Sequence, residues 1–269
     1  MRVDQPLTVQ FPLGTHRNMS QLQFRFYAEL NDFLPQSLRQ VRFPHDFSGN
    51  VTVKHLVESL NVPHTEIDLI LANGRSVGFS YTVKDGDQIS VYPVFESIDI
   101  SSVGRLRPKP LRETKFILDT HLGQLASYLR LIGFDTLYRN DFQDPELALT
   151  ASSQRRILLT KDRGLLKRVL VTHGYCVRNI VPRDQLVEVV RRFDLSDSMQ
   201  PFKRCLRCNH LLQPIEKEKI KHRLPANTRR YYNKFTICTG CQQLYWPGSH
   251  YLRMCRFLKE TLDLDLVED

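Results

Sequence analysis

The pattern of apolar and polar positions changes along the chain, and each change marks a different part. Residues 1–20 have no periodicity, so we expect a loose arm there. Apolar and polar residues then alternate from Gln21 to Ala28, as in a half-buried strand. Asn73-Gly74 is typical of a hairpin turn, and strands broken by one helix predict an α+β domain over residues 21–97. The pattern predicts these elements there: strands at Val41–Phe43, Leu69–Leu71 and Gln88–Tyr92, and a helix at Val53–Leu60.

The next segment, residues 98–113, contains two prolines among basic residues and predicts an extended linker. After it, strands and helices alternate. Phe116–Leu118 and Ile157–Leu159 are short apolar runs, typical of strands buried on both faces of a parallel sheet. One apolar helical face lies between them and ends at Gly133: Leu122, Leu125, Ala126, Leu129 and Ile132.

A short strand at Thr136–Tyr138 follows that helix. Asp144-Pro145 predicts the start of the next one, with Asp144 as its N-cap and Pro145 in its first turn. Beyond Asp162 we expect a helix, a short strand ending near Val181, and a last helix with Asp184 as its N-cap. This alternation predicts an α/β domain with a parallel sheet over residues 114–197.

Three aspartates stand where chemistry is expected in such a sheet. Asp119 and Asp162 each follow a predicted strand, and the carboxyl ends of parallel strands share one edge. Together with Asp144, these two residues offer only carboxylate oxygens, and oxygen ligands are the ones that Mg²⁺ and Mn²⁺ prefer. Each aspartate alone fits a strand-ending or capping role, but the convergence of three favours a metal-dependent phosphodiesterase site. The nearby cations Arg130, Lys161 and Arg163 are either phosphate ligands or ordinary surface charges.

The charge of the chain is unevenly distributed. The net charge is +9 over 269 residues, and residues 202–259 carry thirteen Lys/Arg against two acids, so the remainder is slightly acidic. This favours a polyanion contact near the C-terminus, with a solvated basic surface as the alternative. No apolar run approaches the roughly 20 residues of a membrane span, and we find no secretory signal, so we expect a soluble cytoplasmic protein without a membrane partner.

Two C-x₂-C pairs stand in this basic region. Four thiolates complete a closed tetrahedral Zn²⁺ site, which is structural because it keeps no open position. The 29 residues between the pairs require a hairpin or loop, and the disulfide interpretation is weaker in a chain not marked as secreted. The pattern therefore predicts a small zinc domain with a C-terminal helix over residues 198–269. The expected ligands are Cys205, Cys208, Cys238 and Cys241, with His210, His250 and Cys255 as less favoured substitutes.

Several of these stretches resemble a known family. FILDTHLGQLASYLRLIGFDT, the D-x-E-L step and RILLTKDRGLL resemble the PIN-like ribonuclease domain of the Mut-seven C-terminal RNase family. CLRCNHLLQPI and FTICTGCQQLYWPGSHYLRM match the zinc ribbon that ends it, so the resemblance covers residues 114–258. It implies that Asp119, Asp144 and Asp162 hold the catalytic metal. Gly164 and Leu165 follow the TKD motif where many PIN-type nucleases have a fourth acid, which leaves Glu146 or Asp184 as candidates.

The first domain is similar to β-grasp, ubiquitin-like domains of the small sulfur-carrier type. The resemblance rests on VKHLVESLNVPHTEIDLILANGRSV and VKDGDQISVYPVFE. Pro93–Glu96 occupy the place of the terminal Gly-Gly that carriers need, so we expect a docking or substrate-guiding module without carrier chemistry.

Together these observations predict a Mg²⁺- or Mn²⁺-dependent ribonuclease whose zinc ribbon contacts RNA. The alternative is a non-catalytic RNA-binding or ribosome-associated factor, and a protein docked by the β-grasp domain is a further candidate partner. Aromatic residues of the ribbon either stack on bases or pack its own core, and both interpretations stay open. The candidate RNA-binding residues are Arg207, Arg229, Arg230, Trp246, His250 and Arg253.

Overall fold

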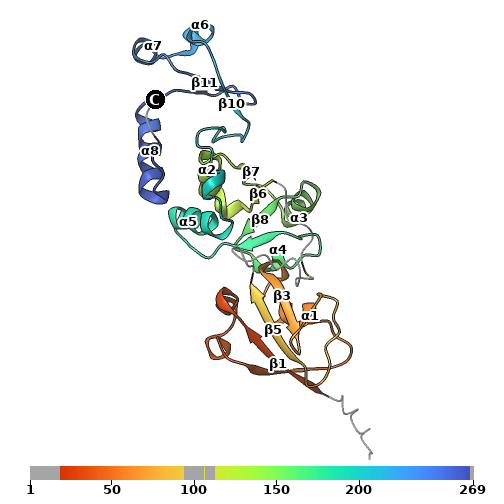
Figure 1. Cartoon of the computed structure of the whole chain (residues 1–269). Coiled ribbons are helices and arrows are strands. Elements are labelled where there is room, and N and C mark those ends of the chain that lie inside the picture. Colours follow the sequence, from red (N-terminus) through yellow and green to blue (C-terminus); the bar gives the residue numbers. More distant parts are fainter. Residues whose placement is uncertain (1–18, 94–105, 107–112, 267–269) are drawn as a thin grey trace, which may run out of the picture.

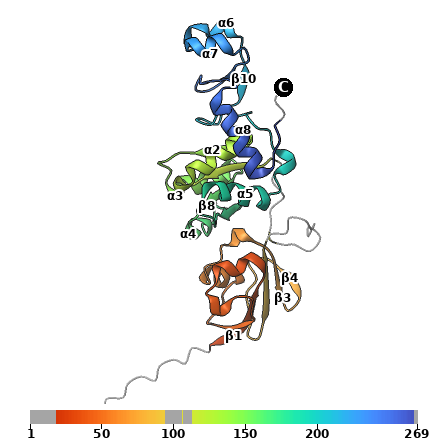
Figure 2. The same cartoon turned by 90° about the vertical axis from the view of Figure 1, so that its left-hand side faces the viewer.

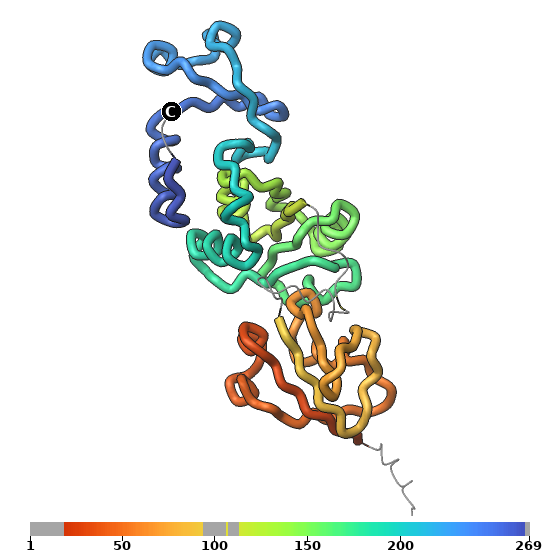
Figure 3. Tube along the Cα trace, in the orientation of Figure 1, coloured from red at the N-terminus to blue at the C-terminus, as the bar shows by residue number. Residues whose placement is uncertain are grey.

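The computed structural model describes residues 19–93, 106 and 113–266, which form three parts in sequence order (Figures 1 and 3). The predicted arm over residues 1–20 and the predicted linker over residues 98–113 lie outside the described residues, except for positions 19, 20, 106 and 113.

The first part is a five-stranded sheet in the order β2-β1-β5-β3-β4, with β1 and β5 parallel and the other neighbours antiparallel. Helix α1 has Thr52 as its N-cap, whose hydroxyl accepts the amide of His55. The elements are β1 (Ser20–Phe26), β2 (Phe43–Phe47), α1 (Val53–Ser59), β3 (Ile67–Ala72), β4 (Arg75–Val77), β5 (Gln88–Pro93) and the short 3₁₀ turns η1 (Ala28–Phe33), η2 (Gln36–Leu38) and η3 (His64–Glu66).

The Asn73-Gly74 prediction is confirmed. Both residues have positive φ, and Ala72 pairs with Arg75 across a two-residue turn. The strand predicted at Val41–Phe43 is displaced, because β2 begins at Phe43 and runs through Pro44. Proline is tolerated there since β2 is an edge strand and needs no amide on its outer side.

The second part contains a four-stranded parallel sheet in the order β7-β6-β8-β9. Alternate residues of β6 and β8 face opposite sides: Ile117 and Leu158 lie in one apolar cluster with α3 and α4, and Phe116 and Leu159 in another with α2 and α5. The elements are β6 (Lys115–Leu118), η4 (Thr120–Leu122), α2 (Gly123–Leu131), β7 (Asp135–Tyr138), α3 (Asp144–Ser153), β8 (Ile157–Thr160), α4 (Arg163–Leu166), β9 (Gly174–Cys176), α5 (Pro182–Arg192) and η5 (Ser196–Ser198).

Gly133 ends the α2 region as predicted, with φ +100°, and a Cβ there would lie 2.3 Å from the carbonyl oxygen of Gln200. Two predictions in this part are wrong. The strand expected to end near Val181 ends at Cys176, because the carboxylate of Glu188 accepts the amides of the following residues and holds them in a loop.

The second wrong prediction concerns helix caps. Val181 is the N-cap of α5, and Asp184 lies in its first turn instead; similarly, Gln143 precedes α3 and Asp144 is its first residue. An acid in the first turn is favourable through the helix dipole without capping.

The third part is a three-stranded antiparallel sheet with two short helices inserted between its first two strands. Helix α8 then runs back along the second part (Figure 2), where Leu258 is fully buried with residues of α2 and α5, and the Phe257 ring stacks on Tyr128 at 4.5 Å. The elements are β10 (Leu212–Pro214), α6 (Lys217–Ile220), η6 (Lys221–Arg223), α7 (Ala226–Tyr231), β11 (Thr236–Cys238), β12 (Leu244–Tyr245) and α8 (Ser249–Leu262).

The first part packs against the β9 edge of the parallel sheet. The Glu66 carboxylate accepts the amide of Cys176 at 2.6 Å, and the Lys167 ammonium donates to the carbonyl of Glu58 at 2.8 Å. One apolar cluster continues across this junction. The predicted fold class, a mixed-sheet α+β domain, a parallel α/β domain and a small four-cysteine ribbon, is confirmed.

Candidate functional site

Asp119 and Asp162 lie at the same edge of the parallel sheet, at the ends of the neighbouring strands β6 and β8. The buried hydroxyl of Thr160 connects them: it donates to Asp119 Oδ2 at 2.7 Å and accepts the amide of Asp162 at 2.9 Å. Asp119 Oδ1 accepts the amide of Thr120 at 2.6 Å. Thr160 therefore orients the Asp119 carboxylate, a role that the pattern of acids in the sequence does not reveal.

One carboxylate oxygen of Asp162 has a structural role. Its Oδ1 accepts the amide of Gly164 at 2.7 Å and so caps α4, while the residue is exposed and no partner of its second oxygen is found among the described residues. A carboxylate oxygen has two lone pairs, so both Asp119 and Asp162 keep capacity for a cation.

The other candidate acids are held by arginines or stand apart. Asp144 forms an ion pair with Arg168 at 3.5 Å, and Glu146 pairs with Arg139 at 2.8 Å. Asp184 is exposed in the first turn of α5, without a hydrogen bond or ion pair within the described residues. Over residues 19–93 and 113–266, the four cysteines described next are the one group of three or more His, Cys, Asp or Glu whose ligand atoms lie close enough to share a metal ion. Asp119 and Asp162 are thus brought to one edge of the sheet, but the candidate acids do not surround a common point within the described residues.

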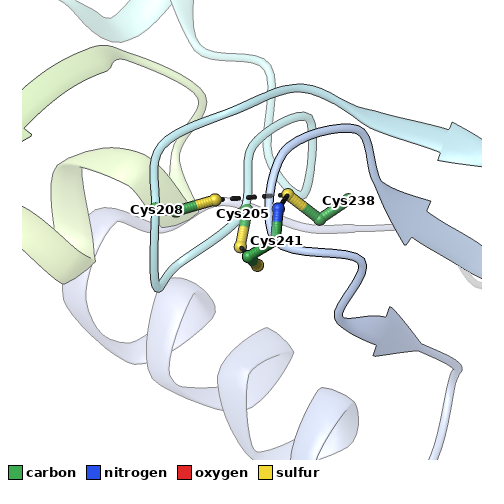
Figure 4. Close-up of side chains that lie close together, drawn as sticks. All are labelled: Cys205, Cys208, Cys238 and Cys241. Atoms are coloured by element: carbon green, nitrogen blue, oxygen red, sulfur yellow. Dashed lines mark hydrogen bonds between the residues drawn. The ribbon is translucent and has the colours of Figure 1, made fainter.

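The four cysteines converge on one point (Figure 4), and their sulfur atoms all lie within 4.8 Å of one another. The Cys205 and Cys241 sulfurs are 3.6 Å apart, and those of Cys208 and Cys238 are 3.3 Å apart. A disulfide requires about 2.05 Å, whereas a tetrahedron with Zn–S bonds of about 2.3 Å has edges of about 3.8 Å. The arrangement could hold a zinc ion, and the substitutes His210, His250 and Cys255 are not part of it.

The two C-x₂-C loops have the same backbone hydrogen bonds. In the first, the amide of Asn209 donates to the carbonyl of Cys205 at 2.9 Å; in the second, the amide of Gln242 donates to Cys238 at 3.1 Å. Asn209 and Gln242, each directly after the second cysteine, both have positive φ. This repeated turn points both thiols of each pair toward the centre.

The electrostatics of the thiols favour a bound cation. Burial raises the pKa of Cys208, but hydrogen bonds from the backbone of His210 and from the neighbouring thiols outweigh it and lower the pKa to about 6. Desolvation and the adjacent sulfurs raise the pKa of Cys241 to about 12. Cys208 therefore ionises readily, whereas ionisation of a further thiol next to it is unfavourable. A divalent cation at the centre would stabilise the additional thiolates.

The first cysteine loop is fastened to the parallel sheet. Asn209 accepts the amide of Thr136 at 2.9 Å and donates to Asp135 at 2.8 Å, at the β7 edge. The buried guanidinium of Arg130 donates to the carbonyls of Leu206 and Arg207. Arg130 is thus a structural link and not a phosphate ligand, and Asn209 is a contact that the cysteine spacing does not reveal.

The candidate RNA-binding residues lie on the ribbon and α8. Most are exposed: Arg207, Arg229, Arg230, His250 and Arg253. Trp246 instead packs in part against a small core formed by Ile220, Leu224, Phe235 and Leu244. Tyr231, by contrast, is an aromatic residue of the ribbon that is 68% exposed. Its ring centroid lies 5.4 Å from the central carbon of the Arg230 guanidinium.

The fold and the two sites define a class: an α/β domain with acids at the carboxyl edge of its parallel sheet, continued by a four-cysteine ribbon and preceded by a ubiquitin-like domain. The family described as "Mut7-C RNAse domain" matches residues 114–258, and the one described as "Mut7-C ubiquitin" matches residues 19–99. The first match covers more than half of the chain, which therefore belongs to the Mut7-C RNase domain family. This membership indicates a nuclease-type function. A comparison with curated proteins found no match.

None of the described helices combines the length and the apolar content needed to cross a bilayer.

Proposed function

We propose that this chain is a divalent-metal-dependent ribonuclease that hydrolyses RNA phosphodiester bonds at the acidic edge of its parallel sheet. Residues 114–197 would carry the chemistry, and residues 198–269 would contact the RNA. The observation that carries the proposal is the juxtaposition of Asp119 and Asp162 on neighbouring strand ends, linked by the Thr160 hydroxyl, in a chain of a nuclease family.

The donor set suits Mg²⁺ or Mn²⁺, because it offers only carboxylate oxygens with free lone pairs. Asp119 and Asp162 would be the principal ligands, and Asp144 would join them after releasing Arg168, an exposed partner 3.5 Å away. A bound divalent ion would supply Lewis-acid stabilisation and an activated water at the phosphorus. Glu146 and Asp184 are weaker candidates for a fourth acid, since Glu146 is paired with Arg139 and Asp184 stands alone.

We also propose that the four cysteines hold one structural Zn²⁺. Four thiolates leave no open position for chemistry, and the ion would stabilise a ribbon whose own core is small. Because Asn209 and Arg130 join the first cysteine loop to the parallel sheet, zinc would also fix the ribbon's position relative to the acids.

The exposed arginines of the ribbon would bind RNA through phosphate contacts, which depend strongly on salt. Arg229 and Arg230 lie on the inserted helix α7, Arg253 and His250 on α8, and Arg207 in the first cysteine loop. The partial burial of Trp246 makes Tyr231 the better candidate for stacking on a base.

The central experiment compares Asp119→Asn with the wild-type chain. Asparagine keeps the shape but removes a ligand charge, so we expect loss of RNA cleavage with Mn²⁺ and loss of the Mn²⁺-induced rise in thermal midpoint, while zinc content and RNA binding stay unchanged. Asp197→Asn, at an exposed position of η5, is the matched control and should behave as wild type. Cleavage that persists in Asp119→Asn would place the chemistry elsewhere.

The second candidate function is a non-catalytic RNA-binding or ribosome-associated factor. The pairing of Asp144 with Arg168 and of Glu146 with Arg139 favours it, since these acids are neutralised by the protein itself. A wild-type chain that binds RNA but cleaves no member of a broad panel with Mn²⁺ would support this alternative.

A further inference from the structure

A pocket of about 420 Å³ lies where the ubiquitin-like domain meets the parallel sheet. Its lining comes from both domains: Asp32 and Phe33 of η1, Lys161 and Arg163 beside Asp162, and Cys176, Val177 and Arg178 at the end of β9. The Val177 amide donates to the Thr160 carbonyl at 2.8 Å, so the end of β9 is fixed next to the end of β8. The pocket therefore adjoins the acidic edge.

The pocket carries an excess of positive charge. It contains three cations and one acid, Asp32. Arg178 is already compensated, since it pairs with Glu66 at 3.4 Å and Asp32 at 3.5 Å. Lys161 is exposed, and neither Lys161 nor Arg163 pairs with an acid anywhere in the described part of the chain. Two cations thus remain available for an anion.

The ubiquitin-like domain holds the pocket's arginines in place. The Phe33 ring is 5% exposed and lies against both guanidiniums, 4.8 Å from Arg163 and 5.2 Å from Arg178. A flat guanidinium on a ring face can still donate from its edges. Arg178 donates in this way to Tyr175 and Glu66. Arg163 contacts the Cys176 thiol without pairing with an acid among the described residues. Glu66 and Asp32, from the same domain, fix Arg178 from the other side.

We propose that this junction pocket binds a backbone phosphate of the RNA strand that occupies the acidic edge, with Lys161 and Arg163 as its ligands and Phe33 as a positioning residue. The inference rests on the proposed function. The pocket is the size of a nucleotide-scale ligand, and its lining combines three cations with the apolar side chains of Phe33 and Val177, which suits a phosphodiester and its attached sugar. Lys161 and Arg163 flank Asp162 in sequence, so a strand held here continues to the acids. The ubiquitin-like domain thereby becomes one wall of the substrate path.

The test measures binding of a short fluorescent oligouridylate to the full chain at several salt concentrations. All variants carry Asp119→Asn to prevent cleavage, and no Mg²⁺ or Mn²⁺ is added. The test variant adds Lys161→Ala and Arg163→Ala. The control adds Arg191→Ala, which removes an exposed cation from the last turn of α5. Zinc content and thermal midpoint verify the fold, and Lys161→Glu alone provides a second variant at an exposed position.

Single-stranded binding loses about 0.7 in the slope of log K against log salt for each phosphate contact removed. We therefore expect the double variant to bind more weakly and to have a slope smaller in magnitude by about 0.7, because both cations contact the same phosphate, whereas the Arg191→Ala chain matches its parent. Lys161→Glu should also weaken binding, because it places a like charge against phosphate.

Three results would overturn the proposal. A slope unchanged by the double variant and affinity unchanged by Lys161→Glu would remove the pocket from the RNA path and leave the proposed function intact. Absence of RNA binding by the parent chain would refute both. Uridine monophosphate that binds through Lys161 and Arg163, with oligouridylate indifferent to them, would identify a free phosphate-ester site instead of a strand contact.

Discussion

Replacing Thr160 with valine tests the link between the two strand-end aspartates. The hydroxyl is fully buried, donates to Asp119 Oδ2 at 2.7 Å and accepts the Asp162 amide at 2.9 Å. Losing a hydrogen bond to a charged acceptor costs about 1.5–3 kcal/mol, and leaving an amide without its partner costs about 1–3 kcal/mol. Burial of the methyl group that replaces the hydroxyl contributes about 0.8 kcal/mol of stability. The lost hydrogen bond to Asp119 costs less than a fully buried one would, because Asp119 is partly exposed. We expect a net loss of about 2–3 kcal/mol.

The matched control is Thr160→Ser, which keeps the hydroxyl and loses one buried methyl at a cost of about 0.5–1.5 kcal/mol. The two variants should also differ in metal response. A divalent ion at a hundred times its dissociation constant stabilises the folded chain by about 2.7 kcal/mol. Thr160→Ser should keep this stabilisation, whereas Thr160→Val should lose most of it, because the Asp119 carboxylate is no longer oriented.

The assay is the thermal midpoint of each variant with and without Mn²⁺, followed by RNA cleavage under the same conditions. A merely structural role of Thr160 would lower the midpoint of Thr160→Val and leave the Mn²⁺ increment intact. An undiminished increment together with undiminished cleavage would therefore refute the positioning argument.

Three further predictions follow from other contacts. Leu258→Ala should lower the free energy of unfolding in urea by about 2–5 kcal/mol, and Leu252→Ala, 47% exposed on the same helix, by no more than about 0.5 kcal/mol; equal losses would contradict the packing of α8 on the parallel domain. Cys238→Ser should abolish stoichiometric zinc in metal analysis, and a full equivalent of zinc in that variant would contradict the four-thiolate site. Burial raises the pKa of Glu66 above its usual 4.5, so the folded chain holds this proton more tightly than the unfolded chain. The stability of the wild type relative to Glu66→Gln should therefore fall as pH rises from below 4.5 through the raised pKa, and a pH-independent difference would be evidence against it.

Helix α2 and the Asn73-Gly74 turn are elements that local sequence specifies. The α2 face from Leu122 to Ile132 and its stop at Gly133 followed from a 3.6-residue period, and the buried side chains match it. The turn at Asn73-Gly74 followed from the need for two positive φ angles. The start of β2 did not follow, because a strand can contain Pro44 only at an edge of the sheet, and the order of the strands is set by tertiary structure.

Among the candidate site residues, the four cysteines could be predicted from the sequence because a C-x₂-C loop imposes its own geometry. The positions of Asp119 and Asp162 at strand ends could also be predicted, but the hydrogen-bond and ion-pair partners of the acids could not. Arg168 lies 24 positions from Asp144 in sequence, and only packing of α3 beside α4 brings the two into an ion pair. Thr160 and Asn209 were missed for the same reason, since their hydrogen bonds reach residues 41 and 73 or 74 positions away.

Sequence alone determined the three-part architecture, the parallel sheet with aspartates after its strands and the four-thiolate cluster, because each depends on local periodicity or on short spacing. Only the tertiary structure decided that Arg130 is a buried link, that α8 completes the core of the parallel domain, and that the ubiquitin-like domain closes a basic pocket beside Asp162. Each of these features arises from contacts between side chains that are distant in sequence. Burial and ion pairing between such side chains occur only when the domains pack together, so no local sequence pattern predicts them.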